Sequence, residues 1–344
     1  MPSITVDNNI TFYYTDSGPP SKSAYVTIFF LHGLTFHSGI FQRLADLAWS
    51  RQLRIIALNR REYPGTTPYT DDERRVIRTG SFEERLSLVQ EQGKLIVLAV
   101  DGLIKQLSLP RRVAVAGWSL GTATLISMYC SIGRVSDDVQ RRLRDSVKTF
   151  ILLDTTIYCL GVPTPPGGYN PFFDRGLSAE QRTPAFQQWA SSYYQHGDLS
   201  SHDISELRLS LSGCELLKRP TVQTMTPMEW ESTASPNSRC DSLIASSFRS
   251  VLEAQTNTFL FDSQIRKLWG KHKFWCLYGE ASMWASIYAS WYLEKKSNEI
   301  NFKSLYGSNH FFMWDYPEGT LDLLIDICAN NDGKNLEYPI PTRL

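Results

Sequence analysis

The sequence lacks the patterns that mark several large classes of protein. Its 344 residues include six cysteines and six histidines, with no Cys-x-x-Cys pair and no histidine cluster beside a cysteine. A structural zinc site needs such spacing, so we expect no metal. Cysteines such as Cys276, in the apolar run Trp275-Cys276-Leu277, are typical of a reducing compartment. No dinucleotide fingerprint or phosphate loop occurs either, so we expect no cofactor.

An excess of charge of one sign is also absent, because Lys plus Arg and Asp plus Glu each number 35. A nucleic acid or an acidic membrane surface needs a basic patch, so we expect neither as the main partner. No run reaches the ~18 apolar residues of a membrane span, and the start, Met1 to Asp7, has no secretory pattern. We expect a cytoplasmic protein of undetermined oligomeric state. The end Thr342-Arg343-Leu344 loosely resembles a peroxisomal Ser-Lys-Leu tail, which makes the peroxisome the alternative.

Short apolar segments alternate with helical patterns over most of the chain. The segment 24–31 is continuously apolar and β-branched, as expected of a strand buried on both faces. Ser81-Phe82-Glu83-Glu84 has capping-box spacing and opens a helix that we expect to reach about Leu107. The alternation predicts right-handed crossovers and a mostly parallel sheet. We expect strands over 10–14, 24–31, 53–58, 112–116, 147–153, 274–278 and 300–306, with further helices over 122–130 and 284–293.

The alternation stops between residues 160 and 269. Residues 161–168 are too rich in glycine and proline for a regular element. Helical patterns follow over 178–194, 204–217 and 240–268. We therefore interpret 1–159 and 270–344 as the two parts of one core, and 160–269 as an inserted helical cap.

Two motifs carry the chemistry of a serine nucleophile. Gly117-Trp118-Ser119-Leu120-Gly121 follows an apolar strand and precedes a helical run. This is the context of a nucleophile elbow, in which a sharp turn lifts the serine hydroxyl clear of the sheet. Gly307-Ser308-Asn309-His310-Phe311 directly follows the last strand. A histidine at that edge can act as the general base for Ser119, so we assign His310 to this role.

The order of these motifs resembles the α/β-hydrolase superfamily, over nearly the whole chain except the cap. The segment 58–69, Leu-Asn-Arg-Arg-Glu-Tyr-Pro-Gly-Thr-Thr-Pro-Tyr, is similar to a conserved turn of that superfamily, with Asn in place of Asp and an added Pro. This variant resembles a group of fungal α/β-hydrolases often encoded beside secondary-metabolite pathways. The resemblance implies esters, lactones or thioesters of polyketide-like molecules as substrates. Ser119 separates the chain from dehalogenases and epoxide hydrolases, which use Asp at that position.

Two further features follow from the fold that the resemblance implies. His32-Gly33-Leu34 follows the strand 24–31, and the residue after such a His-Gly pair supplies one oxyanion-hole N–H. The backbone of Leu120, directly after the nucleophile, supplies the other. We interpret His32 itself as a residue that organises the turn.

The acid of the catalytic triad has two candidates. It usually lies on the turn after the strand that follows the cap, but Ser282 occupies the expected position there. Glu280 is close by and displaced by one or two residues. Asp154, which ends the strand 147–153 before the cap, can reach the same histidine, and we favour it over Glu280.

We therefore predict a serine hydrolase that cleaves an ester, lactone or thioester of a hydrophobic small molecule through an acyl-enzyme on Ser119. The expected substrate-binding residues are Trp118, Phe172 and Trp189. A non-hydrolytic acyltransferase or lyase is one alternative, because fold does not fix reaction. A catalytically impaired ligand-binding homologue is the other.

Overall fold

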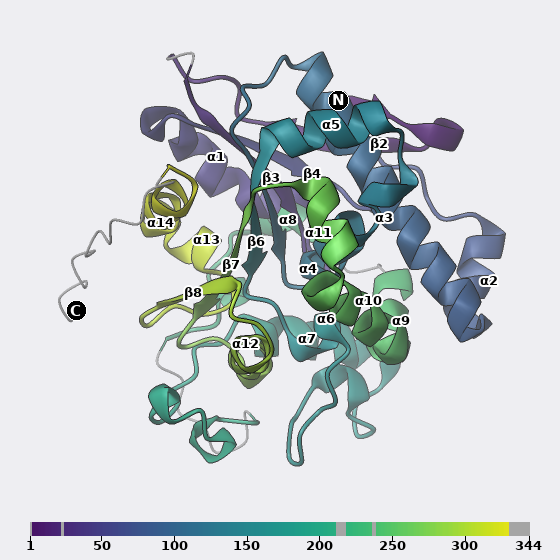
Figure 1. The fold of residues 1–344 in the computed structure, drawn as a ribbon. Helices are drawn as coiled ribbons and strands as arrows, with labels where there is room; N and C mark the ends of the chain where they lie inside the picture. The colour runs from purple at the N-terminus through teal and green to yellow at the C-terminus, as the bar shows by residue number, and fades with distance from the viewer. Residues whose placement is uncertain (1, 22–23, 211–217, 236–238, 330–344) are drawn as a thin grey trace.

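An eight-stranded sheet forms the centre of the molecule (Figure 1). The computed structural model describes residues 2–21, 24–210, 218–235 and 239–329. The strand order is β1-β2-β4-β3-β5-β6-β7-β8, and all neighbours from β4 to β8 in that order are parallel, whereas β1 and β2 pair antiparallel. The mostly parallel sheet expected from the alternation is thus confirmed. The strands are β1 Ser3–Thr5, β2 Thr11–Asp16, β3 Val26–Leu31, β4 Leu53–Leu58, β5 Val113–Trp118, β6 Val147–Leu153, β7 Lys273–Gly279 and β8 Ile300–Leu305.

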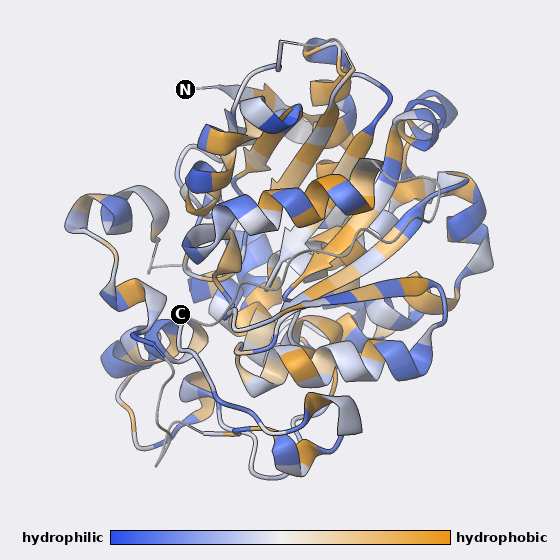
Figure 2. Cartoon of the chain, turned by 90° about the vertical axis from the view of Figure 1, so that its left-hand side faces the viewer, coloured by the Kyte–Doolittle hydropathy of each residue, from blue (hydrophilic) through white to orange (hydrophobic). Residues whose placement is uncertain are grey.

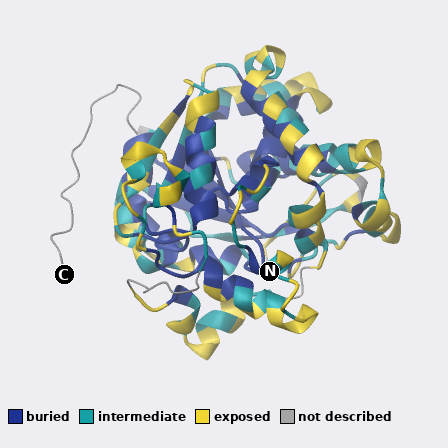
Figure 3. Cartoon of the chain, turned by 90° about the horizontal axis from the view of Figure 1, so that it is seen from below, coloured by how far each residue is buried: buried dark blue, intermediate teal, exposed yellow. Residues whose placement is uncertain are grey.

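Helices cover both faces of this sheet, which explains why its central strands are buried along their whole length. Every residue of β3, β4 and β5 is buried. Figure 2 shows apolar residues along the strands, and Figure 3 shows the buried residues in the interior, in strands and in the helices that cover them. Helices α1 (Gln42–Ala48) and α14 (Pro317–Ala329) pack together on one side. Helices α3 (Phe82–Gln106), α4 (Gly121–Cys130), α5 (Asp137–Ser146) and α11 (Ser263–Trp269) form the layer on the other (Figure 1).

The predicted capping box at Ser81 is confirmed. The Ser81 hydroxyl accepts from the Glu84 N–H at 3.2 Å, and the Glu84 carboxylate accepts from the Ser81 N–H at 2.8 Å. These bonds satisfy two of the free donors at the start of α3. Remaining helices outside the inserted region are α2 (Asp71–Thr79), α12 (Trp284–Lys296) and α13 (Phe312–Asp315). No helix in the described ranges is long and apolar enough to cross a membrane.

The region between β6 and β7 holds six helices within its described residues: α6 (Ile157–Leu160), α7 (Ala179–Ala190), α8 (Pro227–Thr233), α9 (Arg239–Ser247), α10 (Arg249–Phe261) and α11. The continuous helix expected over 240–268 is divided into three. Its last break lies at Asp262, whose carboxylate accepts the N–H groups of Gln264 and Ile265 and so begins α11 anew. Helices α10 and α11 pack against α4 and α5 of the core.

The prediction of a helix over 204–217 is wrong for residues 204–210, the part of this segment that the structure describes. Only Ile204–Glu206 forms a short 3-10 turn, and residues 211–217 lie outside the described part of the chain. The Asp203 carboxylate accepts from the Ser205 N–H, and the Glu206 carboxylate accepts from the Asp198 N–H. Short polar side chains that bond nearby backbone groups compete with helix formation in this way. The Thr342-Arg343-Leu344 end also lies outside the described residues.

Candidate active site

Ser119 lies on a strained turn between β5 and α4. Its φ of 53° is in the left-handed region, which costs a non-glycine residue about 1–2 kcal/mol. Backbone bonds on both sides hold the turn: the Ser119 N–H donates to Leu153 O at 3.0 Å, and the Thr122 N–H donates to Ser119 O at 2.9 Å. The strand, the sharp turn and the helix form the elbow that the sequence pattern predicts.

Three glycines allow the backbone to pass close to this turn. A Cβ on Gly33 would lie 2.9 Å from Ser119 Cβ, and one on Gly121 would lie 2.0 Å from Leu31 O. A Cβ on Gly117 would meet Gly121 O at 2.5 Å. The glycines are therefore required by close approach of the chain rather than by left-handed φ values.

Asp154 and His310 form a buried pair at the ends of β6 and β8. The His310 Nδ1–H donates to Asp154 Oδ2 at 2.5 Å, and the two side chains are 0–2% exposed. The backbone of Asp154 is itself held by its N–H, which donates to Leu277 O at 2.7 Å. A proton on Nδ1 leaves Nε2 as the nitrogen able to accept a proton from a nucleophile.

Ser282, which occupies the usual position of the acid, supports Asp154 instead. Its hydroxyl donates to Asp154 Oδ2 at 2.6 Å, and the Gly279 N–H donates to Oδ1 at 2.8 Å. The Asp154 carboxylate thus accepts three hydrogen bonds in a site closed to solvent. Glu280 points elsewhere, because its carboxylate accepts from the Ser304 hydroxyl on β8 at 2.6 Å.

Trp118, the neighbour of Ser119 in the chain, contacts His310. The Trp118 Nε1–H donates to His310 O at 2.9 Å, and the two rings lie 5.0 Å apart. Among the described residues no hydrogen bond joins Ser119 Oγ to His310 Nε2. Catalytic pairs in unliganded enzymes often tighten only when substrate binds.

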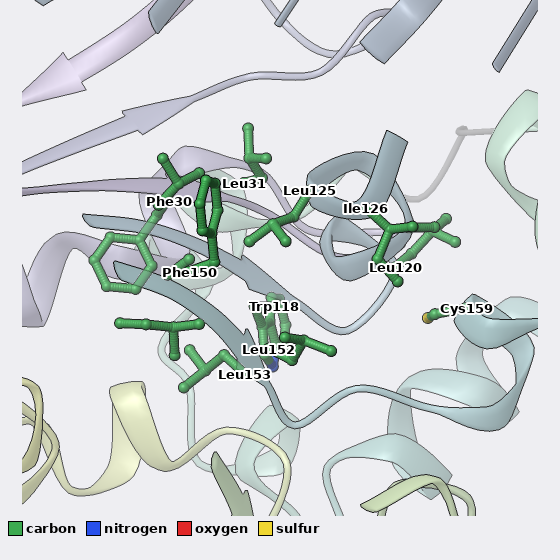
Figure 4. Close-up of a cluster of buried hydrophobic side chains, with 14 of the residues drawn as sticks. Phe30, Leu31, Trp118, Leu120, Leu125, Ile126, Phe150, Leu152, Leu153 and Cys159 are labelled. Carbon is green, nitrogen blue, oxygen red and sulfur yellow. The ribbon is translucent and has the colours of Figure 1, made fainter. Parts of the chain in front are cut away.

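Trp118 does not line the pocket, contrary to the expectation that it binds substrate. It is 1% exposed and packs beside Leu152 and Leu153, whereas Leu120 lies toward Cys159 (Figure 4). The physical reason is that the Trp118 side chain is enclosed by the core and by His310, to whose backbone oxygen its indole N–H donates. Its contacts give it a role in holding His310.

Leu34 and Leu120 border the pocket beside Ser119, where the oxyanion hole is expected. Within the described residues, no hydrogen bond uses the backbone N–H of either residue. His32 accepts the Arg60 N–H on Nε2 at 2.9 Å and donates from Nδ1 to Gly33 O at 2.9 Å. Burial, with Arg60 as a second cause, holds the pKa of His32 well below its usual range, so the ring is neutral.

A pocket opens over Ser119 and is bounded by the inserted region. The predicted residues Phe172 and Trp189 both line it. The further lining residues are Leu34, Ser119, Leu120, Thr156, Tyr158, Cys159, Asn170, Phe173, Phe186, Ser242, Ala245, Ser246 and Met283, most of them apolar or aromatic.

A second network ties the loop of His310 to the inserted region. The Asn309 side-chain amide donates to Ser191 O at 2.7 Å and to the Thr221 hydroxyl at 2.8 Å. Asp315 accepts from Thr221 and, at 2.6 Å, from the Tyr193 hydroxyl. No sequence motif predicted this network. Asn309 alone lies in a motif, because it directly precedes His310.

Comparison with known proteins gives one family. The profile of the Alpha/beta hydrolase family matches residues 28–323. The search of the curated proteins finds no match. Solved structures with a similar fold include an esterase (EaEST) from Exiguobacterium antarcticum, at 12% identity and a TM-score of 0.54 over 95% of this chain and 99% of that one. Another is the carboxylesterase CesB from Bacillus subtilis, at 14% identity and a TM-score of 0.52 over 96% and 92%. A third is Est816, described as an N-acyl homoserine lactone degrading enzyme, at 13% identity and a TM-score of 0.52 over 94% and 98%.

Proposed function

Because the chain belongs to the alpha/beta hydrolase family, we propose that it is a serine hydrolase that cleaves an ester or lactone of a hydrophobic small molecule. The observation that carries this proposal is the Asp154–His310 pair, with its 2.5 Å hydrogen bond, together with a serine that is held at φ 53° and lines a pocket. Each of the three side chains is available for one role of a catalytic triad.

The reaction begins when the Ser119 hydroxyl transfers its proton to His310 Nε2 and its oxygen attacks the substrate carbonyl. Asp154 keeps the proton of His310 on Nδ1 and stabilises the imidazolium that forms. The carbonyl oxygen becomes an oxyanion, which accepts from the N–H groups of Leu34 and Leu120. The C–O bond to the leaving group then breaks, and His310 returns the proton to the departing alcohol. Water, deprotonated by His310, releases the acid from Ser119 in the same way.

The pocket supports a hydrophobic acyl group or ring as the substrate. Phe172 and Phe186 have ring centroids 4.4 Å apart, and Trp189 lies beside Phe186 at 5.8 Å. Aromatic walls favour apolar and planar groups. The esterases and the lactone-degrading enzyme among the fold neighbours agree with an oxygen ester, and the resemblance to fungal α/β-hydrolases suggests lactones or esters of polyketide-like compounds for the first screen.

The test is a panel of nitrophenyl esters of two to eight carbons and of model lactones, assayed with the wild-type protein and with Ser119→Ala. We expect hydrolysis that Ser119→Ala lowers by about 10⁴-fold or more, with an unchanged circular dichroism spectrum. Product analysis with a competing alcohol separates hydrolysis from acyl transfer. Turnover that persists in Ser119→Ala contradicts the proposal.

A further inference from the structure

A buried ion pair joins the inserted region to the loop that carries the oxyanion donor. Arg60 follows β4, and Asp241 lies in helix α9 of the inserted region. Arg60 Nη1 donates to Asp241 Oδ1 at 2.9 Å, and Nη2 donates to Oδ2 at 2.5 Å. The Tyr63 hydroxyl donates to Oδ2 at 2.6 Å. Arg60 is 7% exposed and Asp241 2% exposed, so the pair is closed to solvent.

The same guanidinium holds the backbone of the oxyanion loop, which we define as His32 to Leu34. Arg60 Nε donates to His32 O at 2.9 Å, and Nη2 donates to Gly33 O at 2.8 Å. The Gly33 oxygen also accepts from His32 Nδ1 at 2.9 Å. Burial opposes the charge of Arg60, but Asp241 and Tyr63 together with Tyr69 outweigh this effect and raise the pKa of Arg60, which stays a cation.

The Gly33 carbonyl and the Leu34 N–H belong to one peptide unit. A peptide is planar and trans, so its C=O and N–H point in opposite directions. Fixing the Gly33 oxygen on Arg60 therefore fixes the direction of the Leu34 N–H, the proposed oxyanion donor. A cation on the carbonyl oxygen also polarises the amide and makes its N–H a stronger donor.

Helix α9 connects this peptide to the pocket over Ser119. Ser242, Ala245 and Ser246 of α9 line the pocket over Ser119, and Ser242 is the residue next to Asp241. Because these residues belong to one helix, a shift of α9 at the pocket also shifts Asp241 relative to Arg60.

We propose that Arg60 and Asp241 are positioning residues, through which the docked helix α9 aligns the Leu34 N–H for the transition state. The inference rests on the proposed function, because it concerns the oxyanion of that reaction. An oxyanion donor acts in the transition state more than in the ground state, so its misalignment lowers kcat and leaves KM nearly unchanged.

Two substitutions separate this role from simple support of the fold. Arg60→Lys keeps a cation that can pair with Asp241 but cannot also hold both carbonyl oxygens, because lysine lacks the planar set of donors. Asp241→Asn keeps the shape of the side chain and releases the guanidinium. We expect each to lower kcat for a nitrophenyl ester by about 10- to 100-fold, less than the loss of a whole oxyanion donor, with KM within about threefold.

The matched control is Glu229→Gln. Arg43 and Glu229 also join the core to the inserted region, through α1 and α8 at 2.8 Å, but their side chains are 40% and 30% exposed and contact no part of the oxyanion loop. We expect kcat of this variant within twofold of the wild type. If a single substitution at the buried pair fails to fold, the double variant Arg60→Met/Asp241→Leu replaces the pair by apolar groups, a change that is often neutral for stability. It should fold and still show the loss of kcat.

The outcomes are distinct. If Arg60→Lys, Asp241→Asn and the double variant all keep kcat within twofold of the wild type, the positioning role is refuted while the proposed function stands. A change in KM without a change in kcat also refutes the positioning role and leaves the proposed function standing. If the wild-type protein has no Ser119-dependent hydrolysis, both proposals are refuted.

Discussion

Replacing Asp154 by Asn changes the proton on His310 more than it changes the shape of the site. The Gly279 N–H donates to Asp154 Oδ1 at 2.8 Å, so the oxygen of the Asn amide has to stay at that position. Its nitrogen then takes the place of Oδ2, facing the Ser282 hydroxyl and His310 Nδ1. An amide nitrogen donates, so Nδ1 has to accept and the ring proton moves to Nε2. That tautomer cannot take the proton of Ser119.

The expected cost is about 10⁴-fold in kcat, or about 5.4 kcal/mol at 1.36 kcal/mol for each factor of ten. The assay is hydrolysis of a nitrophenyl ester under saturating substrate, with circular dichroism and thermal melting to establish that the variant is folded. Asn is nearly isosteric with Asp, so we expect the fold to survive at 25 °C.

The matched control is Glu280→Gln. Because Glu280 bonds Ser304 and not His310, we expect a loss of less than about tenfold. A folded Asp154→Asn variant that keeps more than a tenth of the wild-type kcat refutes the reasoning. So does a large loss in Glu280→Gln, which would make Glu280 the acid.

Three further predictions concern packing, the pocket and pH. In Gly33→Ala the new Cβ would meet Ser119 Cβ at 2.9 Å and the Trp118 ring at 3.1 Å, so kcat should fall at least about tenfold; unchanged kinetics would mean that the loop yields freely. Trp189→Ala should raise KM for eight-carbon esters about tenfold while kcat for the acetate stays within about threefold, and equal effects on both esters would place Trp189 outside the acyl site. Burial lowers the pKa of four histidines below its usual value, those of His32, His37, His196 and His272. Below pH 6.5 the unfolded chain therefore binds protons that the folded chain does not, and the folded state loses stability as the pH falls. The melting temperature should drop from pH 7.5 to pH 5.5. A rise on acidification would contradict the sign.

Local sequence patterns predicted most of the strands and helices. The run 24–31 predicted a strand because a strand buried on both faces is mostly apolar and β-branched, and Ser81 with Glu84 predicted the start of α3 from capping chemistry alone. The helix predicted over 204–217 is wrong for the described residues 204–210, because the carboxylates of Asp203 and Glu206 accept nearby backbone N–H groups and stabilise turns instead.

The sequence reduced the candidates for the triad acid to two residues but could not decide between them. Asp154 and Glu280 both end strands that are neighbours in the sheet, and only side-chain directions separate them. The hydrogen bond from Ser282 to Asp154 had a signal in the sequence, because Ser282 occupies the position where the acid is expected. The pairing of Arg60 with Asp241 had no such signal, because the two residues are 181 positions apart and no local pattern links them.

The most direct measurement of the central claim is labelling by a fluorophosphonate, followed by mass spectrometry of the peptides. The reagent reacts with a serine whose proton is taken by a neighbouring base. We predict one adduct per chain, on Ser119, with none in Ser119→Ala and labelling at least about 100-fold slower in Asp154→Asn. A folded wild-type protein that stays unlabelled, or that carries the adduct on another serine, contradicts the assignment of Ser119, His310 and Asp154 as a catalytic triad.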